Sequence, residues 1–299
     1  VDDYVKSVPD SETEIRIAHD VTNLIRKGGF RLTKWISNSR DVLDSLPESE
    51  RVENQTSVDF GANRSESVLG VKWNIETDQL TYDVTVREKK ETKRGILSIV
   101  NSVYDPLGLS SPFILQGKQF LQELTRLKLD WDDPIPDCLN DRWKSWLSSL
   151  HDLHEMKIPR RVSSLDNIVK YDLHHFSDAS LKGVAVACYL RTTDSDGRVD
   201  CNLLYARSKL TPLRPMTVPR LELTAAALAV KIDTMLKGEL DVNLGESTFW
   251  CDSSIVLSYI ANEAKRFQLF VCNRVGQIRN RTDPSQWRFM PTELNPADY

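Results

Sequence analysis

The sequence predicts an α/β fold whose C-terminal half forms a mixed β-sheet. Three successive runs, 169–179, 183–191 and 201–210, are rich in β-branched and aromatic residues, and the turn-forming TTDSDGR separates the second from the third. Short connections of this kind join antiparallel strands. Helices and strands are then expected in alternation, at 219–230, 248–252, 253–261, 266–278 and 286–291. A meander followed by such alternation is typical of a mixed sheet covered by helices.

The N-terminal part predicts a smaller α+β unit. Apolar residues recur at helical spacing across Ser11–Lys27, and Gly28 with Gly29 supplies a C-cap. A strand, a loop without periodicity and a β-hairpin are expected to follow in this order, at 30–37, 38–67 and 68–86. The hairpin turn is expected at Thr77 and Asp78. We expect this unit to be incomplete.

Between these two parts the pattern is helical, from Lys93 to about Leu153. Ser111 followed by Pro112 combines a helix cap with a proline in the first turn. Farther on, Trp143 and Trp146 mark the apolar stripe of another helix. We expect a small bundle of three helices that buries these tryptophans and packs separately from the sheet.

Composition excludes several classes of protein. No apolar run approaches the roughly 18 residues of a membrane span, and the opening VDDYVKSVPD is not an ordinary signal peptide. The five cysteines are widely spaced and form no C-x-x-C pair, which favours a reducing compartment over a disulfide framework or a structural zinc site. A net charge of −4 gives no general attraction to nucleic acid, so binding would need metal ions or a local basic patch such as 87–95.

Glu222 is the residue that fits its helix least. A helix that begins near Pro219 places Glu222 on the same face as three alanines, and a face of small side chains is expected to lie close against the sheet. A buried carboxylate needs a cationic partner, or it takes up a proton. Two alternatives remain open: an ion pair with Arg220 or Arg214, and a metal ion.

Three aspartates stand at comparable positions, near strand ends or helix starts: Asp178, Asp252 and Asp298. Each also has a structural explanation, as a turn former, a helix cap and a first-turn charge, respectively. Their recurrence together with Glu222 favours a site, because sheets with parallel strands build sites at such edges. Four carboxylates would repel one another unless divalent cations lay between them. Oxygen ligands suit Mg²⁺ or Mn²⁺, and a pair of such ions is used in phosphodiester cleavage.

Four stretches, FSDAS, TVPRLELTAA, FWCDSSIVLSYI and NPAD, resemble the ribonuclease H (RNase H) domain of the Pao (Bel-Pao) group of LTR retrotransposons. Upstream, NSVYDPLGLSSPFILQGKQFLQELTRLKLDWDDPIP resembles the helical thumb or connection after reverse transcriptase, and VDDY with GGFRLTKWISN and LGVKW resembles the end of the polymerase palm. The resemblance implies an RNase H-like mixed five-stranded sheet with flanking helices. It also implies three domains: an incomplete α+β palm remnant at 1–90, a helical thumb or connection at 91–156 and the RNase H-like domain at 157–299.

The resemblance also implies chemistry. The metal ligands and catalytic residues of the RNase H-like domain would be Asp178, Glu222, Asp252 and Asp298. They would hold two Mg²⁺ (or Mn²⁺) ions and cleave the RNA strand of an RNA–DNA hybrid. Candidate phosphate contacts are Lys209, Arg214 and Arg220. Asp2 and Asp3 would be polymerase metal ligands, but the third carboxylate and the nucleotide site lie upstream, so we expect no primer extension by this chain.

The alternative is a catalytically inactive retroelement remnant that acts at most as a nucleic-acid-binding scaffold. Relatives often place a histidine shortly before the last aspartate, whereas this chain has Phe289 there and its last histidines are His174 and His175. The four carboxylates favour the enzyme, because an idle site would be expected to lose a charge that costs stability without metal. No Asp-Thr-Gly or Asp-Ser-Gly triplet supports a protease. The implied partners are the hybrid and the remaining polyprotein domains, namely the upstream reverse transcriptase, protease and integrase, with no membrane. The implied location is intracellular, in cytoplasmic virus-like particles or the nucleus.

Overall fold

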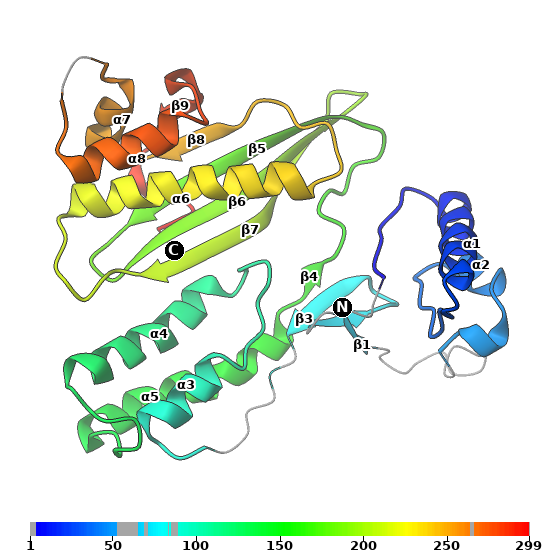
Figure 1. The fold of residues 1–299 in the computed structure, drawn as a ribbon, viewed down its shortest axis with the longest axis horizontal. Coiled ribbons are helices and arrows are strands. Elements are labelled where there is room, and N and C mark those ends of the chain that lie inside the picture. The colour runs from blue at the N-terminus through cyan, green and yellow to red at the C-terminus, as the bar shows by residue number, and fades with distance from the viewer. Residues whose placement is uncertain are drawn as a thin grey trace. The chain divides into compact units, whose positions relative to one another are not determined.

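The computed structural model describes residues 4–52, 65–68, 71–82, 84, 89–263 and 266–298. Asp2 and Asp3, the expected polymerase ligands, lie outside these residues. The chain divides into two compact units, Val1–Leu80 and Thr81–Tyr299 (Figure 1). Within the described residues, no helix combines the length and hydropathy needed to cross a bilayer.

The first unit contains the predicted N-terminal helix, α1 (Ser11–Lys27), with the expected bounds. The side chain of Asp10 caps it by accepting the backbone N–H of Thr13 at 2.7 Å. The strand expected at 30–37 is not formed: Trp35 makes only an isolated bridge, and Lys34 has a left-handed φ of 61° that interrupts extended backbone.

The stretch expected to be a loop holds regular structure. It contains α2 (Arg40–Asp44), the 3₁₀ turn η1 (Glu48–Glu50) and strand β1 (Ser65–Val68). β1 pairs antiparallel with β2 (Val71–Asn74), which neighbours β3 (Gln79–Tyr82) in the sheet. The turn between β2 and β3 contains Asp78 with a positive φ of 50°, as the predicted hairpin requires.

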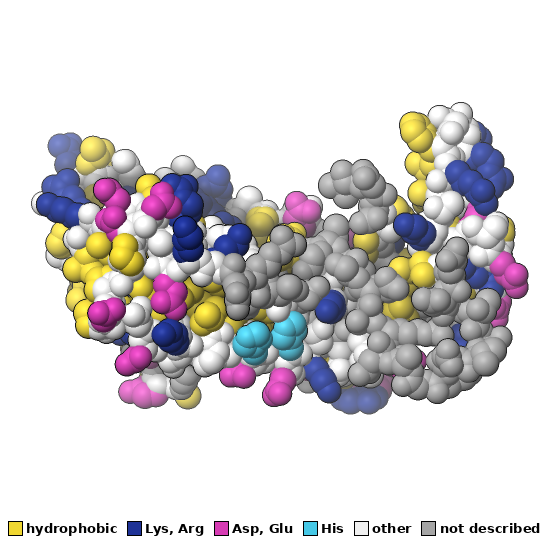
Figure 2. Space-filling model, turned by 90° about the horizontal axis from the view of Figure 1, so that it is seen from below, with side chains coloured by type: hydrophobic (Ala, Val, Ile, Leu, Met, Phe, Trp, Pro, Cys, Tyr) yellow, Lys and Arg dark blue, Asp and Glu magenta, His cyan; other side chains and the backbone are white. Residues whose placement is uncertain are grey.

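The second unit begins with the helical segment. Its elements are α3 (Lys93–Val100), α4 (Ser111–Arg126), α5 (Asp137–Ser149) and the 3₁₀ helix η3 (Leu150–Glu155). Trp143 and Trp146 are buried, as predicted, and their rings stack with centroids 5.1 Å apart. Over the second unit, on the left of Figure 2, acidic and basic side chains are interspersed. Arg94, from the predicted basic patch, pairs with Asp132 at 2.9 Å.

The helical segment does not pack separately from the sheet, which corrects our prediction. α4 and the loop before it lie along strand β7 (Val199–Leu210) (Figure 1). The backbone N–H of Ala206 donates to Leu107 at 2.8 Å, and the Ser208 hydroxyl donates to the Ser111 carbonyl at 3.1 Å. The outermost strand of a sheet has unpaired backbone groups, and here the loop satisfies part of them. The expected domain boundaries at 90/91 and 156/157 stay predictions.

Replacing Gly108 by alanine is expected to loosen this contact. Gly108 has a φ of 72°, and a Cβ there would lie 1.7 Å from the carbonyl oxygen of Ala206. Gly197 is the matched control, because its φ is 81° and a Cβ would meet nothing within 4 Å. Gly197→Ala should lower the free energy of unfolding by about 1–2 kcal/mol from backbone strain alone. Gly108→Ala should lower it by about 1–3 kcal/mol more in urea denaturation. Equal losses would contradict the close contact.

The sheet of the second unit has the predicted mixed topology. Its strand order is β7-β6-β5-β8-β9. β5 (Ile168–Ala179), β6 (Gly183–Asp194) and β7 form the antiparallel meander. β8 (Thr248–Cys251) runs parallel to β5, and β9 (Trp287–Phe289) runs parallel to β8. Outside this sheet, the second unit also contains the short strand β4 (Ile158–Pro159) and the 3₁₀ turns η4 (Pro284–Gln286) and η5 (Thr292–Leu294).

Helix α6 (Val218–Glu239) crosses one face of this sheet, and α7 (Ser254–Ala261) and α8 (Leu269–Arg279) lie on the same side (Figure 1). The predicted alanine face of α6 is buried: Ala225 and Ala226 have no exposed surface. Small side chains bring the helix axis close to β5 and β6, and Leu173, Val186 and Phe249 fill the core around it. The N-terminal end of α6, which carries Glu222, is thereby held against the sheet.

Candidate active site

Asp178 occupies the carboxyl end of β5, where it is half-buried. Burial, together with the nearby charges of Asp252 and Asp298, raises the pKa of its carboxyl group to about 6. A side-chain hydrogen bond with Asp298 contributes to the same shift. The three aspartates predicted from the sequence therefore meet at one edge of the sheet, although they are far apart along the chain.

Glu222 lies at the same edge, in the first turns of α6. Its Oε2 accepts a hydrogen bond from the Ser253 hydroxyl at 2.5 Å. Burial, and then the charges of Asp252, Glu222 and Asp178, raise the pKa of the Cys251 thiol to about 12. One buried sulfur thus lies within the field of all three of these carboxylates.

The alternative partner for Glu222, an arginine, receives no support from Arg220. The guanidinium of Arg220 donates instead to the side chain of Gln268 at 2.9 Å and lies 5.3 Å from the centre of the Phe270 ring. Glu222 is bound by a hydroxyl group, which adds no positive charge. The position therefore remains suited to a cation.

Asp252 is not the cap of the following helix. Ser253 has that role, because its hydroxyl accepts the backbone N–H of Val256 at 3.3 Å. The Asp252 side chain points instead toward the terminal turns, where Oδ2 accepts the Thr292 hydroxyl at 3.0 Å. Released from capping, the carboxylate is available for the site at the end of β8.

Asp298 belongs to an exposed turn that Asn295 fixes to the sheet. The Asn295 side chain is fully buried; its amide donates to the Ser177 carbonyl at 3.2 Å, and its oxygen accepts the Ala297 N–H at 3.1 Å. Ser177 directly precedes Asp178, so this bond holds Asp298 beside it. Sequence reasoning noticed Asn295 only as part of NPAD, and it gave no role to Ser253 or Thr292. Their contacts with the site become visible only in the folded structure.

The two histidines before Asp178 are engaged elsewhere. The ring of His174 stacks on Trp250, whose indole N–H donates to His174 Nδ1 at 3.1 Å, and burial lowers the pKa of His174. His175 has no exposed surface and contacts Asp233. Phe289, at the position where relatives place a histidine, is 55% exposed. These contacts therefore identify none of the three residues as a general acid or base.

The basic candidates lie on exposed or partly exposed positions. Burial, with the charges of Arg207 and Lys231, lowers the pKa of Lys209. Lys209 pairs with Val184 across the sheet, and Ala185 pairs with Asp178, so the lysine lies at the same end of the sheet as the carboxylates. Arg214 is exposed in the loop before α6. The roles of these residues and of Arg220 in phosphate binding stay predictions.

The four carboxylates fit a divalent cation in their chemistry. They are oxygen donors only, which suits Mg²⁺ or Mn²⁺. After burial, repulsion from Asp252 and Asp298 also raises the pKa of Asp178, and a cation between the carboxylates would offset that repulsion. Their side chains are not drawn together around one point: in the described part of the chain, no three histidine, cysteine, aspartate or glutamate side chains are placed to hold a metal ion. Glu222 and Asp252 turn toward hydroxyl groups instead.

Without metal, Asp178 is expected to make stability depend on pH. Its pKa of about 6 in the folded chain exceeds the value of about 3.9 expected in the unfolded chain, so folding takes up a proton between these values. The contribution is fully present below about pH 4 and is lost as the pH rises through about 6. Urea denaturation in chelator should show the stability of wild type relative to Asp178→Asn falling across this window and staying constant above it. A pH-independent difference would contradict the shift.

This sheet, a three-stranded antiparallel meander extended by two parallel strands and crossed by a long helix, defines an RNase H-like fold. The model of the Pao retrotransposon-like RNaseH-like domain matches residues 92–253, more than half of the chain. The chain belongs to this family, and the predicted family and fold class are confirmed. No curated protein matches the sequence significantly.

The solved structures that match part of this chain include two RNase H proteins and a viral protease–reverse transcriptase. The N-terminal RNase H domain of a Mycobacterium tuberculosis protein is 14% identical over 43% of this chain and 89% of that chain, with a TM-score of 0.29. LC11-RNase H1 in complex with an RNA/DNA hybrid is 15% identical over 43% of this chain and 91% of its own, with a TM-score of 0.29. A foamy viral protease–reverse transcriptase in complex with dsDNA is 14% identical over 78% of this chain and 46% of its own, with a TM-score of 0.25.

Proposed function

We propose that this RNase H-like domain hydrolyses the RNA strand of RNA–DNA hybrids with two divalent cations. The observation that carries the proposal is the meeting of the four predicted carboxylates at one edge of the sheet. Asp252 and Asp298 both act on the pKa of Asp178, and Glu222 shares the surroundings of Cys251 with two of them. The family membership of the chain supports the same chemistry.

In this mechanism Asp178 and Asp252 would be the central ligands, and Glu222 and Asp298 would each complete one ion site. The chemistry that a pair of divalent cations would supply there is activation of a water molecule and stabilisation of negative charge on the leaving 3′-oxygen. The chain supplies orientation: the Ser253 hydroxyl holds Glu222, and the Thr292 hydroxyl holds Asp252. Asn295 keeps the turn of Asp298 against β5.

Substrate choice would depend on shape. A-form-like geometry and ribose 2′-hydroxyl groups distinguish a hybrid from DNA without any contact to base edges. Lys209 stands two strands from Asp178 at the same end of the sheet, roughly 10 Å away at the usual spacing of neighbouring strands. It is in register with Val184 and Ala179, whereas Asp178 is in register with Ala185 and Ser208, so the lysine would meet a phosphate from the α6 side of the sheet. Arg214 and Arg220 flank the start of α6 and would hold the backbone on the other side of Glu222.

The test is cleavage of a hybrid labelled in its RNA strand by the full chain. Cleavage should require Mg²⁺ or Mn²⁺, stop in chelator, and spare single-stranded RNA and both homoduplexes of the same sequence. The same ions should raise the melting temperature, because saturation at 100 times the dissociation constant stabilises the folded state by about 2.7 kcal/mol. A chain that neither cleaves the hybrid nor gains stability from either ion would overturn the proposal.

An inactive scaffold is the second candidate. One observation favours it: Phe289 stands at the position where relatives place a histidine. Histidine typically contributes a factor of about 10² to 10⁴ through general acid or base catalysis, so its loss can also mean a slower enzyme. Hybrid binding without ion-dependent cleavage or stabilisation would favour the scaffold.

The wider setting is also part of the proposal. We infer that the domain works beside the other parts of a retrotransposon polyprotein, namely reverse transcriptase, protease and integrase, in cytoplasmic virus-like particles or the nucleus. Its expected division of labour is degradation of RNA after DNA synthesis by the polymerase domain. Co-purification of this chain with RNA–DNA hybrids from such particles would support this setting. Particles that lack this chain would contradict it.

A further inference from the structure

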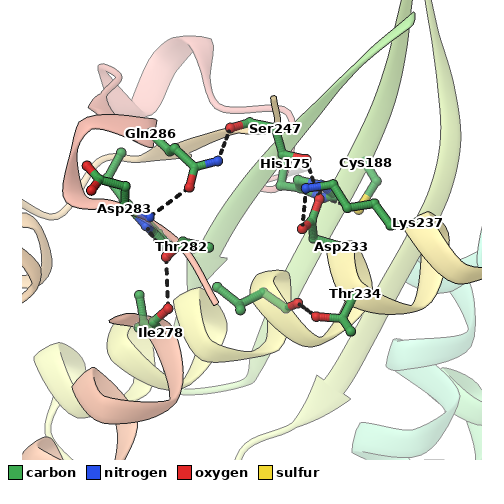
Figure 3. Close-up of polar contacts among 12 residues, drawn as sticks. His175, Cys188, Asp233, Thr234, Lys237, Ser247, Ile278, Thr282, Asp283 and Gln286 are labelled. Carbon is green, nitrogen blue, oxygen red and sulfur yellow. Dashed lines mark hydrogen bonds and ion pairs between the residues drawn. The ribbon is translucent and has the colours of Figure 1, made fainter. Parts of the chain in front are cut away.

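A buried polar cluster lies between helix α6 and strand β5 (Figure 3). Its centre is Asp233 of α6, only 4% exposed. Oδ1 of Asp233 contacts Nε2 of His175 at 2.9 Å and accepts a short hydrogen bond from the Ser247 hydroxyl, and Oδ2 pairs with Lys237 at 3.0 Å. Cys188 contacts the other ring nitrogen of His175. We call these five residues the Asp233 cluster.

Asp233 is the acceptor of the cluster. Burial, aided by the charge of Asp233, raises the pKa of the Cys188 thiol far above its ordinary value, so the thiol keeps its proton, and its sulfur lies 3.0 Å from Nδ1 of His175. Nε2 of His175 donates to the Asp233 carboxylate at 2.9 Å. Although burial opposes ionisation of Asp233, hydrogen bonds from His175 and Ser247 lower its pKa. A buried carboxylate that accepts from every side cannot shift without leaving donors or charge unpaired.

The cluster joins the three elements that carry three of the four proposed ligands. His175 lies on β5 upstream of Asp178, and Ser247 directly precedes β8, which ends beside Asp252. Asp233 itself lies about three helical turns after Glu222 on α6.

The cluster also reaches the strand at the edge of the sheet. The side-chain amide of Gln286 donates to the Ser247 carbonyl at 2.9 Å, and its oxygen accepts the Asp283 N–H at 2.7 Å in the capping box of η4 (Figure 3). η4 leads directly into β9, which precedes the turn of Asp298. The network therefore extends to the segment that leads into β9, the strand before the turn of Asp298.

The packing of α6 near Glu222 explains what such a cluster adds. Part of the contact face is small, with Ala225, Ala226 and Ala229, and the residues on either side of Glu222 are the buried Leu221 and Leu223. Apolar side chains can repack when a helix shifts slightly, whereas hydrogen bonds to one buried carboxylate hold it to particular donors. A shift by one residue along the axis would move Glu222 by about 1.5 Å. Metal–ligand distances tolerate only about 0.2 Å, so directional contacts add to the precision that apolar packing gives the site.

We infer that Asp233 is a positioning residue: through His175 and Ser247 it sets the register of α6 on the sheet and thereby the place of Glu222 beside Asp178 and Asp252. Its consequence for ion binding rests on the proposed function, whereas the register itself is a property of the fold. Nothing in this role requires Asp233 to touch substrate or ions.

The test compares Asp233→Asn with Leu236→Ala in the full chain. Leu236 is buried on the same helix but makes only apolar contacts in the core, so its variant controls for lost stability. Isothermal titration with Mn²⁺ well below both melting temperatures should show affinity about 10- to 100-fold weaker for Asp233→Asn, as for other residues that orient metal ligands. The kcat for hybrid cleavage should fall at unchanged KM. Leu236→Ala should keep wild-type affinity.

Two further measurements keep the inference open to refutation. Ser247→Ala removes one donor without emptying the cluster, so it should fold and weaken Mn²⁺ binding in the same direction by a smaller factor. Crystal structures should show Glu222 displaced relative to Asp178 in Asp233→Asn but not in Leu236→Ala, which tests the register without any metal. If wild type binds no Mn²⁺, the proposed function fails and the displacement alone decides. An undisplaced Glu222, or equal affinity losses in both variants, would overturn the inference.

Discussion

Replacing Asp252 by asparagine is expected to abolish ion-dependent cleavage of the RNA strand while leaving the metal-free fold as stable as wild type or more stable. Asp252 is one of two aspartates whose charges raise the pKa of Asp178, so its neutralisation relieves repulsion in the chain without metal. Its bond to Thr292 is exposed and contributes little. Loss of a direct ligand should reduce cleavage by at least the roughly 100-fold seen for residues that only orient ligands.

Asp10→Ala is the matched control for this variant. Asp10 caps α1 through the backbone N–H of Thr13, so its removal should lower the free energy of unfolding by about 0.5–2 kcal/mol and leave cleavage unchanged. Asp252→Asn should therefore lose activity without losing stability, whereas Asp10→Ala should lose stability without losing activity. Stability is measured by urea denaturation in chelator, and activity by hybrid cleavage. If Asp252→Asn melts several degrees lower and still cleaves, Asp252 is structural, and the assignment of the site fails with it.

The largest loss of stability is expected from Trp143→Ala. Trp143 is 1% exposed, and its ring lies 5.1 Å from that of Trp146 and 5.5 Å from that of Phe120. Truncation of this side chain removes an aromatic contact between α4 and α5 and leaves a cavity. We expect the free energy of unfolding of the second unit to fall by about 3–5 kcal/mol, as measured by chemical denaturation.

Trp131→Ala provides the comparison within the same segment. Trp131 is 47% exposed, and its main contact is the ammonium group of Lys93, 4.8 Å from the ring centre. A contact of this kind contributes less than about 1 kcal/mol at an exposed site. Similar losses for Trp131→Ala and Trp143→Ala would mean that the helical segment has no specific core around Trp143.

Elements whose bounds depend on residues close together in the sequence could be predicted. The bounds of α1 follow from its cap and helical periodicity, and the meander of β5, β6 and β7 follows from alternation and turn residues. The strand expected at 30–37 failed because backbone conformation at Lys34 overrides the pattern. The separate packing expected of the helices failed because the bond between Ala206 and Leu107 joins backbone groups, which leave no trace in side-chain pattern.

The candidate site shows the same division. Asp178, Glu222, Asp252 and Asp298 could be proposed because carboxylates at strand ends and helix starts recur in one stretch of sequence. The residues proposed to orient these carboxylates could not be predicted from the sequence. Asn295 bonds to Ser177 and Asp233 bonds to His175 across long separations in sequence, and each looks ordinary in its own neighbourhood. Buried polar partners of this kind are identified only when the fold brings them together.

The loop at Leu107 and Gly108 has a practical consequence for where the chain can be divided. β7 is the outermost strand of its sheet, and a fragment that starts at residue 157 would present that strand bare. Bare outer strands invite pairing between copies and lead to aggregation. Recombinant fragments that retain the helices from residue 92 should therefore stay monodisperse at concentrations where the shorter fragment precipitates. The helical segment would then be needed to keep the RNase H-like domain soluble.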